Sequence, residues 1–182
     1  MALKRRAKGG ARRPRRGGLA ETRTPFAAPR RASRPPIRDP YEQDFYSWTR
    51  RQAAVLRRLT ADGNGTADFA NLAEEIESLG KEQASALRSS YQVLLAHLLK
   101  WQYQPVKRST SWRNTIRRER RNIELRLEDN PGLKNRRAGL FARAYRLARA
   151  DAADETDLPV ATFPIESPWS LAEAIDEAFW PG

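Results

Sequence analysis

Apolar side chains recur at three- and four-residue steps in the first folded segment of the chain. This stripe consists of Phe45, Trp48, Gln52, Val55, Leu56 and Leu59. Such spacing places the side chains on one face of an α-helix. Asp39-Pro40 suits the start of that helix, because proline is tolerated in the first turn. The pattern predicts an amphipathic helix over 41–59 that ends before the turn residues ADGNG.

The next segment predicts one long central helix over about 68–103. Asn71 and Glu74 have the spacing of a capping box at its start. Gly80 costs up to ~1 kcal/mol relative to alanine and permits a kink, and Pro105 prevents the helix from continuing much beyond Tyr103. The apolar stripe expected to face the core is Leu72, Ile76, Leu79, Ala86, Leu87, Leu94, Leu98 and Trp101.

Three further helices are predicted in the second half of the chain. The third, over about 109–129, begins at STSW, where Ser or Thr can cap it. The fourth covers about 131–156, and the fifth is the short segment WSLAEAIDEAFW near the C-terminus. Convincing strand patterns and repeats are absent. The sequence therefore predicts an all-α fold, an antiparallel bundle of about five helices around the long central helix.

The formal net charge of +12 belongs to the beginning of the chain. Residues 1–38 hold 13 Lys and Arg side chains and one acid, Glu21, while basic and acidic residues balance from Asp39 onward. This Arg-, Pro- and Gly-rich segment has few large apolar residues with which to build a core. We expect a disordered basic tail over 1–38 and a single helical domain over 39–182. The tail is a solvated extension or an arm that binds nucleic acid nonspecifically through phosphates. A mitochondrial transit peptide is a third option, which the Gly and Pro content opposes.

Several classes of protein are excluded by composition. The chain has no cysteine, which rules out disulfides, thiolate metal sites and a cysteine nucleophile. It has no apolar run of the roughly 20 residues that a membrane span needs, and its first residues lack the apolar stretch of a signal peptide. We therefore expect a soluble cytoplasmic protein that has no membrane partner, and no cofactor is predicted.

Several motifs resemble those of a known family. They are YEQDFYSW, NLAEEIESLGK, LLAHLLKWQYQP, RSTSWRNTI, ETDLPVATFP and the terminal FWP. In order and spacing they resemble the bacterial domain-of-unknown-function family numbered twenty-nine, over about residues 41–181. The resemblance implies an all-helical domain from a bacterium, and it implies no catalytic residues.

His97, the one histidine of the chain, is the first candidate for chemistry. It falls on the same helical face as Leu94, Leu98 and Trp101, so we interpret it as a core-facing residue hydrogen-bonded near Trp101 and Trp112. A metal site with Glu119 on the third helix is the sharper alternative. Hydrolysis by a nucleophilic serine is a further one, although the glycine-flanked elbow is missing. The residues assigned structural roles are Trp48, His97, Trp101, Pro105 and Trp112.

Basic residues are concentrated on the third helix and its entrance. Residues 105–149 hold 14 Lys and Arg against four acids, whereas residues 150–182 hold eight acids and no base. A phosphate backbone could follow the basic stripe, or the basic and acidic segments could pair within the fold. The candidate anion contacts are Lys107, Arg108, Arg113, Arg117, Arg120 and Arg121.

Three hypotheses for function remain open. The leading one is a non-enzymatic interaction or adaptor module with an unknown protein partner, because most of the notable residues are explained by packing. The second is a nucleic-acid-binding protein that uses the basic tail and the Arg-rich third helix. The third is a metal-dependent or hydrolytic enzyme centred on His97. The oligomeric state stays open.

Overall fold

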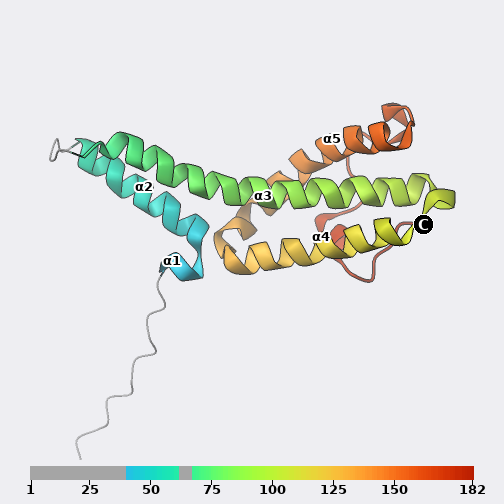
Figure 1. Cartoon of the computed structure of the whole chain (residues 1–182), viewed down its shortest axis with the longest axis horizontal. Helices are drawn as coiled ribbons and strands as arrows, with labels where there is room; N and C mark the ends of the chain where they lie inside the picture. The colour runs from blue at the N-terminus through green and yellow to red at the C-terminus, as the bar shows by residue number, and fades with distance from the viewer. Residues whose placement is uncertain (1–39, 62–66) are drawn as a thin grey trace, which may run out of the picture. The chain divides into compact units, whose positions relative to one another are not determined.

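Six α-helices and three short 3-10 turns make up the regular structure of the residues that the computed structural model describes, 40–61 and 67–182 (Figure 1). The helices are α1 (Pro40–Gln43), α2 (Phe45–Ala61), α3 (Phe69–Tyr103), α4 (Thr110–Asp129), α5 (Arg137–Thr156) and α6 (Leu171–Ile175). The 3-10 turns are Pro105–Lys107, Pro131–Arg136 and Val160–Thr162. These residues contain no strand, and the predicted all-α class is confirmed.

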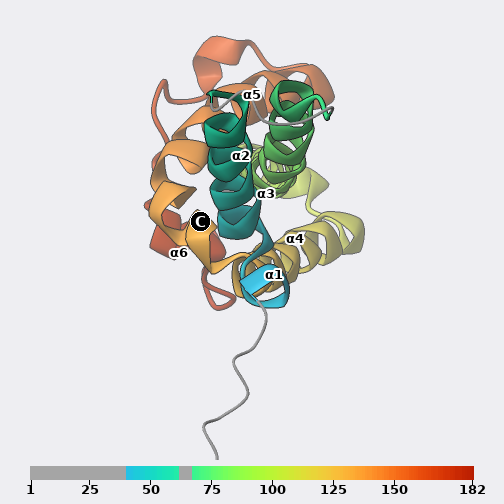
Figure 2. The same ribbon diagram turned by 90° about the vertical axis from the view of Figure 1, so that its left-hand side faces the viewer.

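The long helix α3 is the centre of the fold. Its first half packs against α2, and it also packs against α4 and α5 (Figures 1 and 2). From its middle onward α3 is apolar on several sides, as expected for a helix that is covered by more than one neighbour. Its largest fully buried residues are Leu87, Tyr91, Leu94, Leu95, Leu98 and Leu99. The predicted bundle around a central helix is thus confirmed.

The neighbours of α3 complete the core. Helix α4 contributes Ile116 and Ile123, and both are almost completely buried. Helix α5 contributes a run of small residues that lets its backbone approach α3 closely, namely Ala144, Ala148 and Ala152. The irregular segment after α5 covers this core with Phe163 and Trp169.

Helix starts follow local capping chemistry. The side chain of Ser109 accepts a hydrogen bond from the Trp112 amide at 3.3 Å, as the STSW motif predicts. At α3 the cap is Asp68, whose carboxylate accepts from the Asn71 amide at 3.1 Å. The expected capping box of Asn71 and Glu74 is therefore wrong by one turn, because an acid that precedes Asn71 takes the capping role.

Three predicted helices have different limits in the structure. The helix expected over 41–59 is divided at Asp44, whose carboxylate accepts from the amides of Ser47 at 3.0 Å and Gly132 at 2.9 Å. The helix expected over 131–156 begins as the 3-10 turn Pro131–Arg136. The expected C-terminal helix is reduced to α6, and Asp176 ends it with a side chain that accepts from the Ala178 amide at 2.9 Å.

Gly80 allows a close crossing of α2 and α3, and α3 runs through it as one helix, without the break that the sequence permits. Here Thr49 of α2 is fully buried, and its Oγ1 donates to the Tyr46 carbonyl at 2.8 Å. A Cβ at position 80 would lie 2.3 Å from this Oγ1. Glycine is therefore the residue that this helix crossing requires.

Two sequence predictions meet the limits of what the structure describes. The basic tail expected over 1–38 lies outside the described residues, so that prediction and its nucleic-acid role stay predictions. Within the described helices, none combines the length and the apolar character that a membrane crossing requires.

Candidate interaction surface

Arg120, a predicted phosphate contact, holds the C-terminal segment in place. It is only 3% exposed. Its guanidinium donates to three backbone carbonyls, those of Ala174 at 3.0 Å, Glu177 at 3.3 Å and Phe179 at 2.7 Å. Burial lowers the pKa of this guanidinium from its usual value. Because the side chain is buried against the C-terminal segment, Arg120 acts as an internal contact of the fold, and its assignment as an anion contact is corrected.

Other arginines of the predicted stripe also face the end of the chain. Arg108 donates to the Trp101 carbonyl at 2.8 Å and to the backbone oxygens of Pro181 and Gly182. Trp101 is buried, and its ring lies 4.9 Å from that of Trp180. The guanidinium of Arg113 lies over the first ring and that of Arg117 over the second. These side chains form a cation-π layer that fastens the last residues to α4.

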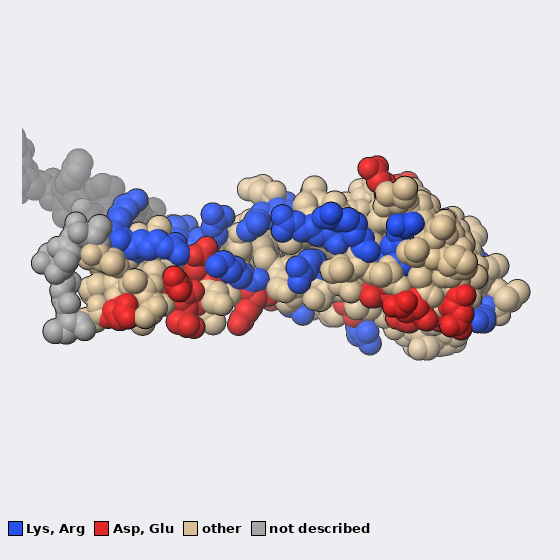
Figure 3. Space-filling model, turned by 90° about the horizontal axis from the view of Figure 1, so that it is seen from above, with Lys and Arg blue, Asp and Glu red and all other residues tan. Residues whose placement is uncertain are grey.

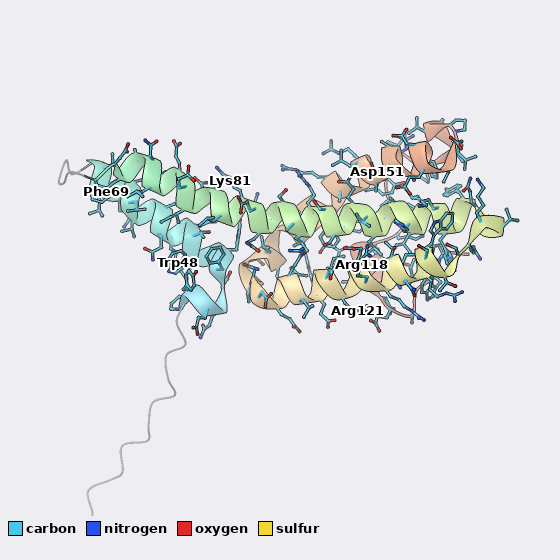
Figure 4. The ribbon with its side chains drawn as sticks, viewed as in Figure 1. Trp48, Phe69, Lys81, Arg118, Arg121 and Asp151 are labelled. Atoms are coloured by element: carbon cyan, nitrogen blue, oxygen red, sulfur yellow. The ribbon has the colours of Figure 1, made fainter. Side chains whose placement is uncertain are left out.

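Two members of the predicted stripe are not part of this layer. Lys107 and Arg121 are exposed, and Figure 4 labels Arg121 on α4. The structure thus divides the six candidates into the buried Arg120, the three arginines of the cation-π layer, and two that lie outside this layer. Pro105 opens the 3-10 turn between α3 and α4, which agrees with its structural assignment.

His97 is bonded to its own helix. Its Nδ1 lies 2.9 Å from the Val93 carbonyl oxygen, which can only accept, so Nδ1 carries the proton. The hydrogen bond that the sequence analysis expected near Trp101 and Trp112 is made to the backbone of α3. The ring of Trp112 lies instead under the ammonium of Lys100, 4.6 Å from its Nζ, and that ammonium is ion-paired with Glu155.

Glu119, the proposed metal partner of His97, also has local partners. Its buried carboxylate accepts from Arg118 Nε at 2.9 Å and from Asn122 Nδ2 at 3.2 Å. Among residues 40–61 and 67–182, no group of three His, Asp or Glu side chains has the arrangement of a metal site. The chemistry at these two residues is that of satisfied hydrogen bonds within their helices.

The pH dependence of stability tests this description of His97. Burial, and then the nearby Lys100, lower its pKa below the usual 6.5. The unfolded state therefore binds the proton first, and the free energy of unfolding should fall as pH drops below about 6.5 toward the lower folded pKa. In His97→Gln this component should be missing. Denaturation curves of both proteins at several pH values between about 5 and 7.5 check it, and parallel pH profiles would contradict the assignment.

An unpaired apolar surface lies on the hairpin of α2 and α3. Two stripes with alternating steps of three and four residues form it, and we call them together the hairpin seam. Its members are Phe45, Trp48, Gln52, Val55 and Leu59 on α2, and Phe69, Leu72, Ile76, Leu79 and Gln83 on α3. None of these ten residues is buried. The spacing is that of the a and d positions of a heptad, which is typical of helices that pack against other helices.

Four large aliphatic side chains of the hairpin seam are exposed together on its surface. Val55 is 47% exposed, Leu59 39%, Leu72 46% and Leu79 43%. The sequence prediction placed Val55 and Leu59 on the apolar face of their helix, and it placed Leu72 and Leu79 on the core-facing stripe of α3. That assignment is corrected, because α4 and α5 pack on the later part of α3 and leave its beginning to α2 alone.

Both stripes lie on the same side of the hairpin. On α2 the stripe is turned by roughly 100° from the contact made by Thr49 and Ala53, given 100° per residue. On α3 it is turned by roughly 70° from Ala73 and Gly80, in the same rotational sense. Because the two helices are antiparallel, equal senses of rotation bring the stripes to one face. Figure 4 labels two seam residues, Trp48 near the start of α2 and Phe69 at the start of α3.

Trp48 anchors the hairpin seam at the end that is nearer to α1. Its ring lies 4.8 Å from that of Tyr41 and 5.9 Å from that of Phe45. It is half-buried in this aromatic cluster and does not belong to the main core. The structural assignment of Trp48 from sequence therefore concerns the corner between α1 and α2.

Charges of opposite sign follow the two edges of the hairpin. Helix α2 carries four arginines and no acid, namely Arg50, Arg51, Arg57 and Arg58. The first half of α3 carries Glu74, Glu75, Glu77 and Glu82 against Lys81. Seen from above, Figure 3 shows the basic side chains along one edge of the hairpin and the acidic ones along the other. Within the hairpin, Arg57 is ion-paired with Glu77 and keeps the pKa of this carboxyl below its usual value.

Comparison with known proteins identifies a family and a structural neighbour. The model of a family described as "Domain of unknown function DUF29" matches residues 40–180. An alpha-helical protein of unknown function from Rhodospirillum rubrum, known from its crystal structure, is 25% identical and superposes with a TM-score of 0.57. The match covers 76% of this chain and 90% of that one. The search among curated proteins gave no match.

Proposed function

This chain belongs to the family described as "Domain of unknown function DUF29", and we propose that within it the chain acts as a non-enzymatic interaction module. Its binding surface is the hairpin seam, and α4, α5 and the C-terminal segment hold that hairpin in place through α3. The observation that carries this proposal is the exposure of Val55, Leu59, Leu72 and Leu79 on one face.

The energetic argument rests on the apolar area that a partner would cover. Burying one Leu or Val side chain completely is worth about 1.5–3 kcal/mol, and these four are about half exposed. Large contiguous apolar patches on a soluble domain mark interaction sites more often than single exposed residues do. The heptad pattern on both helices also indicates that the partner contributes a helical surface.

The residues considered for catalysis support this choice by their local bonds. His97 and Glu119 are each bonded within their own helices, and Arg108 and Arg120 are bonded to the end of the chain. These side chains are explained by the fold. The hairpin seam is the feature that the fold does not explain.

Site-specific photo-crosslinking in cells tests the proposal. The photoreactive residue p-benzoylphenylalanine replaces Leu72 in the full chain, and in a matched control it replaces Val106, which is 97% exposed but lies far along the chain from the hairpin seam. We expect one discrete adduct from position 72 and none from position 106. Equal adducts from positions 72 and 106 would refute the interaction module. So would the absence of adducts both from position 72 and from a second position of the hairpin seam, such as Val55.

A further inference from the structure

We infer that the partner on the hairpin seam is a second copy of this chain, with α2 of each copy beside α3 of the other. This inference rests on the proposed function and names its partner. The evidence is the self-complementary charge of the hairpin, in which the basic edge belongs to α2 and the acidic edge to α3 (Figure 3). When a two-fold axis parallel to the helices places the two hairpin seams face to face, α2 of each copy lies beside α3 of the other. Each basic edge then meets an acidic edge.

The heptad positions of individual charges support this pairing. When the hairpin seam supplies positions a and d, Thr49 of α2 and Gly80 of α3 both fall at e, and these two residues do meet inside the hairpin. Antiparallel neighbours in a helical bundle pair e with e on one flank and g with g on the other. The g positions are therefore the flanks that remain for the second copy.

The g positions carry charges of opposite sign on the two helices. Within the two helices they are Arg51 and Arg58 on α2, and Glu75 and Glu82 on α3. All four are exposed, and none is involved in the ion pair of Arg57 with Glu77. Charged residues that flank an apolar seam select partner and orientation in coiled coils.

The same charges disfavour other arrangements of two copies. Placing α2 beside α2 would bring Arg51 and Arg58 of one copy against those of the other, and placing α3 beside α3 would bring Glu75 and Glu82 together. Like charges held face to face at an interface cost several kcal/mol. The pairing of α2 with α3 is the one in which the apolar seam and both charged edges are matched.

Charge reversal provides the test, with mass measured by sedimentation velocity and by light scattering over a range of concentrations. The first variant of the full chain is R51E/R58E, which makes both edges acidic, and the second is E75R/E82R, which makes both edges basic. We expect the wild type to form dimers and each variant alone to dimerise at least about tenfold more weakly. An equimolar mixture of the two should form a heterodimer. The control is E74R on the outer side of α3, which should dimerise like the wild type.

The outcomes separate this inference from the proposed function. A wild type that stays monomeric at all concentrations would overturn the second-copy inference. So would charge-reversal variants that dimerise as strongly as a dimeric wild type and no more strongly when mixed. In the crosslinking experiment, an adduct of twice the mass of the chain supports the second copy. An adduct of any other mass rejects the second copy and leaves the interaction module standing, whereas the absence of adducts rejects both.

Discussion

Replacing Arg120 with alanine is expected to lower the free energy of unfolding by about 3–5 kcal/mol. The substitution removes the donors to three backbone carbonyls, those of Ala174, Glu177 and Phe179. It also removes the cation over the ring of Trp180, whose centroid lies 5.3 Å from Arg120 Cζ. Urea denaturation followed by tryptophan fluorescence measures the effect.

Arg121→Ala is the matched control for this experiment. Arg121 is the next residue of α4, has the same chemistry and is exposed, so its loss should change the free energy of unfolding by no more than about 0.5 kcal/mol. Limited proteolysis should cut the C-terminal segment sooner in Arg120→Ala than in the control. Equal stability of the two variants would show that the hydrogen bonds of Arg120 to the C-terminal segment are not a major source of stability.

Replacing Gly80 with alanine is expected to destabilise the fold by about 1–3 kcal/mol, although alanine is the better helix former. The new methyl group would lie 2.3 Å from Thr49 Oγ1, and Thr49 is fully buried. A short branched side chain cannot move aside without shifting α2 against α3. Thermal and urea unfolding of the variant, compared with the wild type, measure the cost.

A double-mutant cycle identifies the cause. Thr49→Ala removes the clashing hydroxyl, so Gly80→Ala should cost much less in the Thr49→Ala background than in the wild type, and the two substitutions should couple favourably. Because alanine also improves helix propensity, the double variant should equal or exceed Thr49→Ala alone in stability. Additive effects would mean that the clash does not control this crossing.

Most of the fold could be predicted because its helices carry local signals. The start of α4 at Ser109 and the end of α3 before Pro105 are set by side chains a few residues away. Two of the errors occur where distant groups intervene. Asp44 divides the first helix partly by bonding Gly132, and the C-terminal helix is shortened beside carbonyls that Arg120 holds from another helix. Such contacts between distant segments leave no trace in local periodicity.

The candidate surface was visible in the sequence as a pattern but was assigned to the wrong environment. The stripe through Leu72 and Leu79 reads the same whether α3 is covered by its own chain or by a partner. Only the positions of α4 and α5 along α3 show that its first half is left open. The arginines pose the opposite problem, since Arg108 and Arg120 donate to backbone oxygens, and a charge pattern does not indicate such acceptors.

The three hydrogen bonds from Arg120 to backbone carbonyls affect which sequence changes the C-terminal segment can accept during evolution. Its acceptors are main-chain oxygens, which every amino acid supplies, so a substitution at the exposed Glu177 leaves the bond to that carbonyl possible. An insertion or deletion between Ala174 and Phe179 would instead displace the carbonyls relative to the single guanidinium that binds all three. The C-terminal segment should therefore tolerate changes of residue far better than changes of length.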